Sequence, residues 1–249
     1  MFSQLAGLGQ QKETPDLTSM RTQMQNLKTK LFAPLTFSVI IACAATAQAV
    51  IVYPNYTVPV SGTTLTARPY LAGVEVANAA ISFSFTDTTT GGLISGELYN
   101  EVLQEASGTL DFYYQVIQDP SSGGPVGAVR TSGFGTGSTD CDFRLDESGT
   151  VAPIEVIRFS GSSEGDLNFV FDDNGVQAGQ SSYDMFIKTT AKYYDQNGST
   201  DITGAEVDDN GISSEMATYE PVAVPEPDSL ALLVIGLLLR LPRRLRCVV

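Results

Sequence analysis

Regular alternation of apolar and polar residues is the feature that most restricts how this chain can fold. Ile81, Phe83 and Phe85 alternate with serines, which places the apolar side chains two residues apart. The same period of two recurs in residues 110–116, 154–159, 167–171 and 183–188. Successive side chains of a β-strand point to opposite faces of a sheet, so this period indicates half-buried strands.

Clusters of glycine, serine, asparagine and aspartate separate these segments, as turns between strands require. They cover residues 86–92, 119–127, 132–138, 161–165, 172–175 and 196–198. Residues 49–60 also look extended, and Pro54 and Pro59 confine them to a sheet edge or a bulge. Residues 98–106 are the single helical candidate. The pattern predicts an all-β domain over residues 50–200, an antiparallel β-sandwich with a jelly-roll or immunoglobulin-like layout.

The alternation fades after Thr200. Residues 201–223 are acidic, contain glycine and serine, and have few aromatic residues. This composition is typical of an exposed linker, and we expect one here.

Charge is unevenly distributed over the 249 residues, whose formal net charge is -14. Residues 50–223 hold six basic and 24 acidic residues, which gives this stretch a charge of -18. Such a surface repels phosphate, so we expect no nucleic acid partner. The sequence contains no histidine, which excludes Ser-His-Asp and Cys-His catalysis, and no tryptophan for sugar stacking. Cys141 is the one cysteine in this stretch, and its acidic neighbours disfavour a reactive thiolate.

The N-terminal region has the pattern of a secretory signal peptide over residues 24–49, after an extension, residues 1–23, that is dispensable or precedes the true start. Lys28 and Lys30 form a basic segment, an apolar stretch follows, and Ala47 and Ala49 form a small-x-small cleavage site. Two alternatives remain open. The segment could be a lipoprotein signal in which Cys43 is lipidated. Alternatively, the apolar stretch could stay in the membrane as an uncleaved anchor helix.

Acidic turns offer oxygen ligands for a hard cation such as Ca²⁺. The best of them places Asp195, Asn197 and Asp201 at nearby positions, although the spacing of a calcium-binding loop is absent. The alternative is a β-turn around Asn-Gly. We therefore expect no cofactor, with Ca²⁺ as an open possibility. A carboxylate pair could also hydrolyse a glycoside, but the sequence singles out no pair.

The C-terminal residues 224–249 combine a Pro-Glu-Pro motif, an apolar run and a basic end. The motif is Pro225, Glu226 and Pro227, and residues 230–239 are apolar. As a helix this run would span roughly 15 Å, about half of the ~30 Å hydrocarbon core of a bilayer. It is too short for a permanent anchor.

This arrangement resembles the PEP-CTERM protein-sorting domain. The resemblance implies an exported protein of a Gram-negative bacterium that uses the general secretion machinery, enters the inner membrane transiently and is cleaved by exosortase. It also implies a location at the cell envelope or outside the cell, with exopolysaccharide or biofilm as a possible partner. The implied roles are recognition by Pro225, Glu226 and Pro227, a transient membrane segment that includes Leu230, Leu233, Gly236 and Leu239, and a stop signal of Arg240, Arg243, Arg244 and Arg246.

Three functions follow from these observations. The first is a non-catalytic protein of the cell surface or extracellular matrix. The second is a secreted β-sandwich module that binds Ca²⁺ or carbohydrate. The third, which the composition favours least, is a hydrolase.

Overall fold

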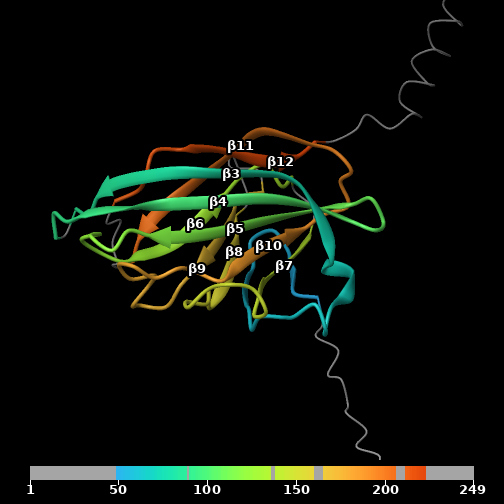
Figure 1. Ribbon diagram of the computed structural model, residues 1–249, viewed down its shortest axis with the longest axis horizontal. Coiled ribbons are helices and arrows are strands. Elements are labelled where there is room, and N and C mark those ends of the chain that lie inside the picture. The colour runs from blue at the N-terminus through green and yellow to red at the C-terminus, as the bar shows by residue number, and fades with distance from the viewer. Residues whose placement is uncertain (1–48, 89, 136–137, 160–164, 206–210, 223–249) are drawn as a thin grey trace, which may run out of the picture. The chain divides into compact units, whose positions relative to one another are not determined.

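The computed structural model describes residues 49–88, 90–135, 138–159, 165–205 and 211–222 (Figure 1). Contacts divide the chain into residues 1–43 and 44–249, and every described residue belongs to the second unit. The predicted signal peptide with Ala47, the alternative lipid site Cys43 and the sorting tail from Val224 onward lie outside the described residues. They stay predictions.

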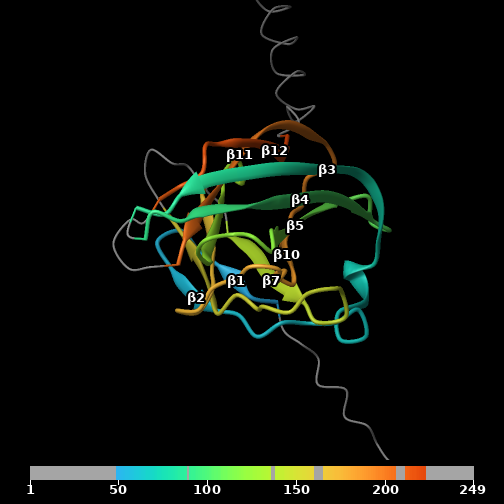
Figure 2. The same ribbon diagram turned by 60° about the vertical axis from the view of Figure 1, so that its left-hand side comes forward.

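Twelve strands form two six-stranded sheets within the described part of the chain. Sheet A has the order β1-β7-β10-β5-β4-β3, and sheet B has the order β12-β11-β6-β9-β8-β2. Figure 2 shows β3, β4, β5, β10 and β7 following one another across sheet A. The bounds are β1 Ile51–Val52, β2 Thr57–Pro59, β3 Gly73–Thr86, β4 Leu93–Glu105, β5 Leu110–Gln118, β6 Val126–Thr131, β7 Thr139–Arg144, β8 Glu155–Arg158, β9 Leu167–Val170, β10 Asp184–Lys188, β11 Tyr194–Gly204 and β12 Met216–Pro221. The named strands pair antiparallel, which confirms the predicted all-β class.

A single hydrophobic core joins the two sheets. Phe112 and Tyr114 of β5 belong to the same buried cluster as Val129 of β6, Phe169 of β9 and Ile202 of β11. These residues occupy alternate positions of their strands and therefore face the same side of their respective sheets, as the alternation predicted. Burial of this apolar surface between the sheets supplies the main stabilisation of the domain.

Three predictions about local structure were wrong. The helical candidate at residues 98–106 lies almost entirely in β4, where Leu98, Asn100 and Val102 are buried at a period of two. The expected linker at residues 201–223 contains the end of β11 and all of β12. Its polar residues are compatible with burial because they pair. The hydroxyl of its buried Thr218 lies 3.0 Å from that of Thr200, the residue just before the segment, and Thr200 donates to the Thr131 hydroxyl at 3.0 Å.

The predicted turn at residues 196–198 is also wrong, because this segment lies inside β11. The pairing register with β12 shifts between Asp195 and Gly198, which is the signature of a β-bulge. Asparagine and glycine are common at both features, so composition alone does not separate a turn from a bulge.

Residues 49–60 lie at sheet edges, as predicted from Pro54 and Pro59. The short strands β1 and β2 lie at one edge of sheet A and one edge of sheet B, and β2 ends at Pro59. The opposite edge of sheet A is the long strand β3. There the Tyr194 hydroxyl donates to the Val76 carbonyl at 3.1 Å, and the Tyr219 hydroxyl donates to the Asn78 carbonyl at 3.2 Å.

Among the residues that the structure describes, no helix is long and apolar enough to cross a membrane.

Candidate ligand-binding cleft

Part of the outer face of sheet A is covered, although half-buried strands were expected there. Asp111, Tyr113 and Gln115 of β5 are buried, and they point away from the core that joins the two sheets. The segment 61–72, which includes the short 3-10 helix η1 (Pro69–Leu71), crosses this face before β3 begins. Its Leu71 forms a second apolar cluster with Tyr113 and Phe186, against which Leu65 and Leu103 pack.

Arg68 anchors this segment. Its side chain is completely buried and forms ion pairs with Asp140 and Asp142 of β7. Its guanidinium also lies 5.2 Å from the ring centroid of Phe186 and 5.3 Å from that of Tyr70. Burial raises the pKa of both aspartates, and the Arg68 charge opposes that rise. The two anionic partners compensate the desolvation of the arginine.

The beginning of the segment is fixed by its backbone. The Gly62 amide donates to Asp142 Oδ1 at 2.9 Å, and the Thr63 amide donates to the Phe143 carbonyl at 2.8 Å. Gly62 has a φ of +77°, and a Cβ there would lie 2.6 Å from the Phe143 ring. Only glycine fits this position without displacing the ring.

A second buried charge cluster lies beside the first. Lys188 of β10 pairs with Glu105 and lies 3.9 Å from Asp111. Burial raises the pKa of Asp111 to about 7, with a further rise from Asp140, while Thr189 and Arg68 oppose it. The Asp111 carboxylate is fully buried and makes no hydrogen bond within the described structure.

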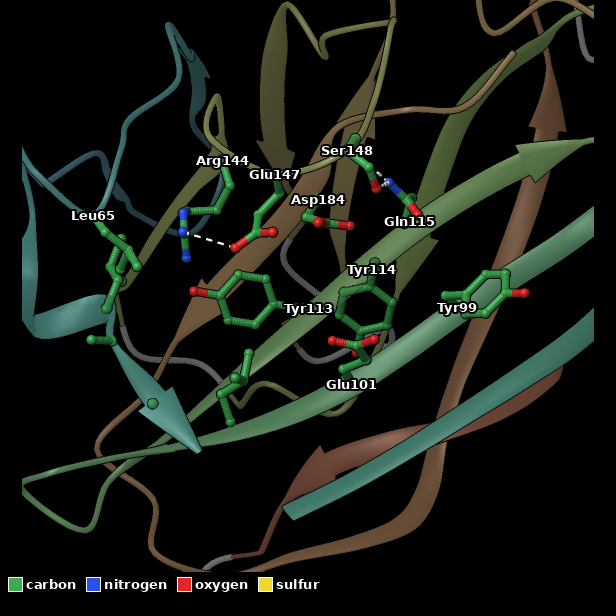
Figure 3. A pocket seen from close by; sticks show the side chains of 14 residues that line it. Leu65, Tyr99, Glu101, Tyr113, Tyr114, Gln115, Arg144, Glu147, Ser148 and Asp184 are labelled. Carbon is green, nitrogen blue, oxygen red and sulfur yellow. Dashed lines mark hydrogen bonds and ion pairs between the residues drawn. The ribbon is translucent and has the colours of Figure 1, made fainter. Parts of the chain in front are cut away.

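A cleft of about 350 Å³ opens between the covering segment and the strands beneath it (Figure 3). Strands β4, β5, β7 and β10 form its floor, and residues 65 and 71–73 form one wall. Its lining residues are Leu65, Leu71, Ala72, Gly73, Tyr99, Glu101, Leu103, Tyr113, Tyr114, Gln115, Arg144, Glu147, Ser148 and Asp184.

Three carboxylates meet at this cleft. Burial raises the pKa of Asp184 to about 7, and the charges of Glu147 and Glu101 add to the rise. Burial also raises the pKa of Glu101, with contributions from Glu75 and Glu147. Asp184 and Glu101 make no ion pair within the described residues, although Arg144 lies opposite Asp184 in the pairing of β7 with β10.

Arg144 is already engaged by other acids. Its Nε donates to Asp146 at 2.7 Å, and its terminal nitrogen donates to Glu147 at 2.9 Å, the pair drawn as a dashed line in Figure 3. The Tyr113 hydroxyl points into the space between Arg144 and Leu65 in Figure 3. Tyr113 is only 4% exposed, and its hydroxyl makes no hydrogen bond of acceptable geometry there. Burial raises the pKa of Tyr113 to about 12.

Hydrogen-bond acceptors dominate the remaining polar lining. The Gln115 amide nitrogen donates to the carbonyls of Ser148 at 2.6 Å and Ser182 at 3.0 Å. Only its carbonyl oxygen therefore remains for a ligand. Together with the free carboxylates of Glu101 and Asp184, this lining suits a ligand rich in hydrogen-bond donors.

The structure separates the residues predicted to share a calcium site. Asp195, Asn197 and Asp201 lie along β11, where six residues of extended chain span roughly 20 Å. Asn197 contacts Asp195, with its Nδ2 donating at 2.7 Å, whereas Asp201 lies across from Arg130 in β6. In the described ranges, no group of three or more acidic or cysteine residues is placed to hold a metal ion. The three residues do not form one site.

The cleft residues were missed at the level of sequence. Glu101 lies in the segment that was a helical candidate, and Asp184 was interpreted only as the polar partner of Tyr183 and Met185. The sequence did contain a signal for this face. Tyr113 and Asp184 occupy the positions of two predicted strands that point away from the core. Cys141, for which the sequence predicted no reactive thiolate, is buried in the core.

The sequence matches no protein-family model, and searches of the curated proteins and of the solved structures found no match. The similarity of the tail to the PEP-CTERM domain therefore stays a prediction.

Proposed function

We propose that this chain is an exported, non-catalytic protein of the bacterial cell surface or extracellular matrix, and that its β-sandwich binds a saccharide in the cleft on sheet A. The sorting tail and the signal peptide support the location. The cleft supports the binding function.

The observation that carries the binding proposal is the pairing of free acceptors with aromatic and apolar surface in one cleft. Glu101, Asp184 and the Gln115 carbonyl can accept hydrogen bonds from sugar hydroxyls. Tyr99 and Leu103 of β4 line the same cleft and can pack against the C–H face of a sugar ring. A cleft of about 350 Å³ is within the usual size of small-molecule sites.

The binding proposal is tested by titrating the purified protein with oligosaccharides of varied composition and following heat release. We expect saturable binding that Glu101→Gln and Asp184→Asn weaken at least tenfold. Asp173→Asn is the matched control, because Asp173 is exposed on a turn outside the cleft. Equal binding by all variants would place the ligand elsewhere. No binding by any oligosaccharide would leave only the structural, matrix role.

The route of the protein is a separate proposal. In it the secretion machinery exports the chain, the apolar residues 230–239 hold it briefly in the inner membrane, and exosortase recognises Pro225, Glu226 and Pro227 and cleaves nearby. The test is to replace Glu226 with Gln or to delete residues 230–249, and to follow the mature mass and the location in an exosortase-bearing host. Unchanged mass and location in both variants would contradict the proposal.

A further inference from the structure

The cleft has an excess of negative charge. Glu101, Glu147 and Asp184 line it together with one cation, Arg144, and that cation pairs with Glu147 and with Asp146 outside the lining. Glu75 of the neighbouring strand β3 adds a further anionic influence on Glu101. The carboxylates of Glu101 and Asp184 thus make no ion pair within the described residues, although the charge of Arg144 opposes the rise in the pKa of Asp184.

The spacing of the two free carboxylates argues against a chelated metal ion. Glu101 lies on β4 and Asp184 on β10, and β5 lies between these strands. Two interstrand spacings place their backbones roughly 10 Å apart. Metal ions require several ligands at 2.0–2.6 Å, whereas an organic cation with several donors can contact acceptors that are farther apart. The lack of a metal-holding group among the described residues agrees with this.

The Tyr113 hydroxyl is a second indication of a ligand. Burial raises its pKa and the neighbouring Arg144 opposes that rise, but no hydrogen bond of acceptable geometry joins the two side chains. A buried hydroxyl without a hydrogen bond costs free energy, so such groups are rare unless a missing partner completes them. Tyr113 lies on β5, between the strands that carry Glu101 and Asp184, and it lines the same cleft. A ligand hydroxyl or amine that entered beside Arg144 would give it a partner.

From this arrangement we propose that the saccharide bound by the cleft carries protonated amines, as in a de-N-acetylated amino-sugar oligomer, and that separate ammonium groups donate to Asp184 and to Glu101. This inference rests on the proposed function. Each ammonium group offers three donors and a full positive charge, which matches a carboxylate that makes no ion pair within the described residues. The hydroxyls of the sugar then contact Gln115 and Tyr113.

Acidification should weaken this binding. Asp184 has a pKa of about 7, so it is mostly charged at pH 7.5 and mostly protonated at pH 5.5. Burial is the main cause of this pKa. The charges of Glu147 and Glu101 in the same cleft raise it further, and the charge of Arg144 opposite Asp184 lowers it. A protonated Asp184 no longer attracts an ammonium group. High salt should weaken the binding as well, because the cleft is open to solvent.

The decisive experiment compares two probes on the full-length protein by calorimetric titration at pH 7.5. One probe is a β-1,4-linked glucosamine trimer, and the other is the same trimer with every amine acetylated. We expect the amine form to bind at least tenfold more tightly, and to lose about tenfold in affinity at pH 5.5. Asp184→Asn and Glu101→Gln should abolish most of this preference, and Asp173→Asn should preserve it.

The outcomes separate the two proposals. Equal or tighter binding of the acetylated trimer would overturn the amine specificity and leave saccharide binding intact. A preference that survives in both Asp184→Asn and Glu101→Gln would also overturn it. Absence of binding by both trimers overturns the amine specificity, and the wider oligosaccharide titration then decides whether saccharide binding fails too. Melting curves of each variant show whether it is folded, and we expect Asp184→Asn to be at least as stable as the parent, because burial disfavours its charge.

Discussion

Arg68 and Asp140, which are 72 residues apart in the sequence, form a buried ion pair that joins the segment 61–72 to strand β7. The pair converts a connection between two sheet edges into a fixed cover for the outer face of sheet A. Leu65 and Leu71 of this cover line the cleft. The stability of the domain and the shape of the cleft therefore depend on the same contact.

Replacement of Arg68 by Met should destabilise the protein strongly. The change leaves Asp140 and Asp142 without their cation in a buried site, which typically costs about 3–5 kcal/mol. Urea denaturation followed by circular dichroism measures the loss. Lys192→Met is the matched control, because Lys192 is exposed, and it should change the free energy of unfolding by less than about 0.5 kcal/mol. A loss equal to that of the control would show that the pair does not hold the cover.

Asp111 should make the protein less stable as the pH rises from about 4 to about 7. Its folded pKa of about 7 lies above the ordinary value near 3.9. The folded state therefore holds a proton that the unfolded state has already released, and stability falls with pH through this window before levelling above it. Asp184 contributes in the same direction.

Asp111→Asn should flatten this pH dependence and stabilise the protein at pH 8 by on the order of 2 kcal/mol. Denaturation midpoints at pH 5, 6, 7 and 8 measure the slope. Asp173→Asn, on an exposed turn, should leave it unchanged. A slope that is equally steep in Asp111→Asn would assign the effect to other carboxyl groups.

Tyr114→Phe should cost about 1–2 kcal/mol. The Tyr114 hydroxyl accepts a bond from Thr131 at 3.1 Å and donates to the Tyr219 carbonyl at 3.3 Å, and so links the two sheets through the core. Tyr113→Phe is the comparison, because no hydrogen bond of acceptable geometry joins the Tyr113 hydroxyl to the neighbouring Arg144, and it should cost less than Tyr114→Phe. Thermal unfolding of both variants tests the difference. Equal losses would argue against the inter-sheet bonds as the cause.

Cys141 should resist alkylation in the native protein. Burial raises the pKa of its thiol, and the neighbouring Asp140 raises it further, so little thiolate forms at pH 8. We expect iodoacetamide to modify Cys141 only after unfolding in guanidinium, as measured by peptide mass mapping. Rapid native labelling would indicate that β7 opens often.

The alternation of residues 110–116 predicted β5 and its core-facing side chains correctly, since a period of two follows directly from strand geometry. It did not predict the burial of Asp111 and Tyr113. That burial depends on a cover supplied by Arg68, and no local pattern links this arginine to Asp140. The cleft was missed for the same reason. Glu101 and Asp184 line one cleft only because β4 and β10 flank β5 in the sheet, and the local sequence does not give that strand order.

The misassigned linker has a different cause. Residues such as Thr200 and Thr218 look hydrophilic individually, and their burial becomes favourable only when their hydroxyls meet across β11 and β12. Single-sequence patterns register hydrophobicity and do not register such pairing. The signal peptide and the tail involve no tertiary contact in their prediction, which is why they could be proposed from sequence with specific residues.

The two tyrosines at the edge of β3 have a consequence for contact between copies of this protein. An incoming strand from another molecule needs the carbonyls of the open edge, and those of Val76 and Asn78 already accept bonds from Tyr194 and Tyr219. The longest exposed strand of the domain thus offers a visiting chain fewer places to attach. Pairing of this edge with a strand of a second copy, a first step towards fibres, is disfavoured in this way.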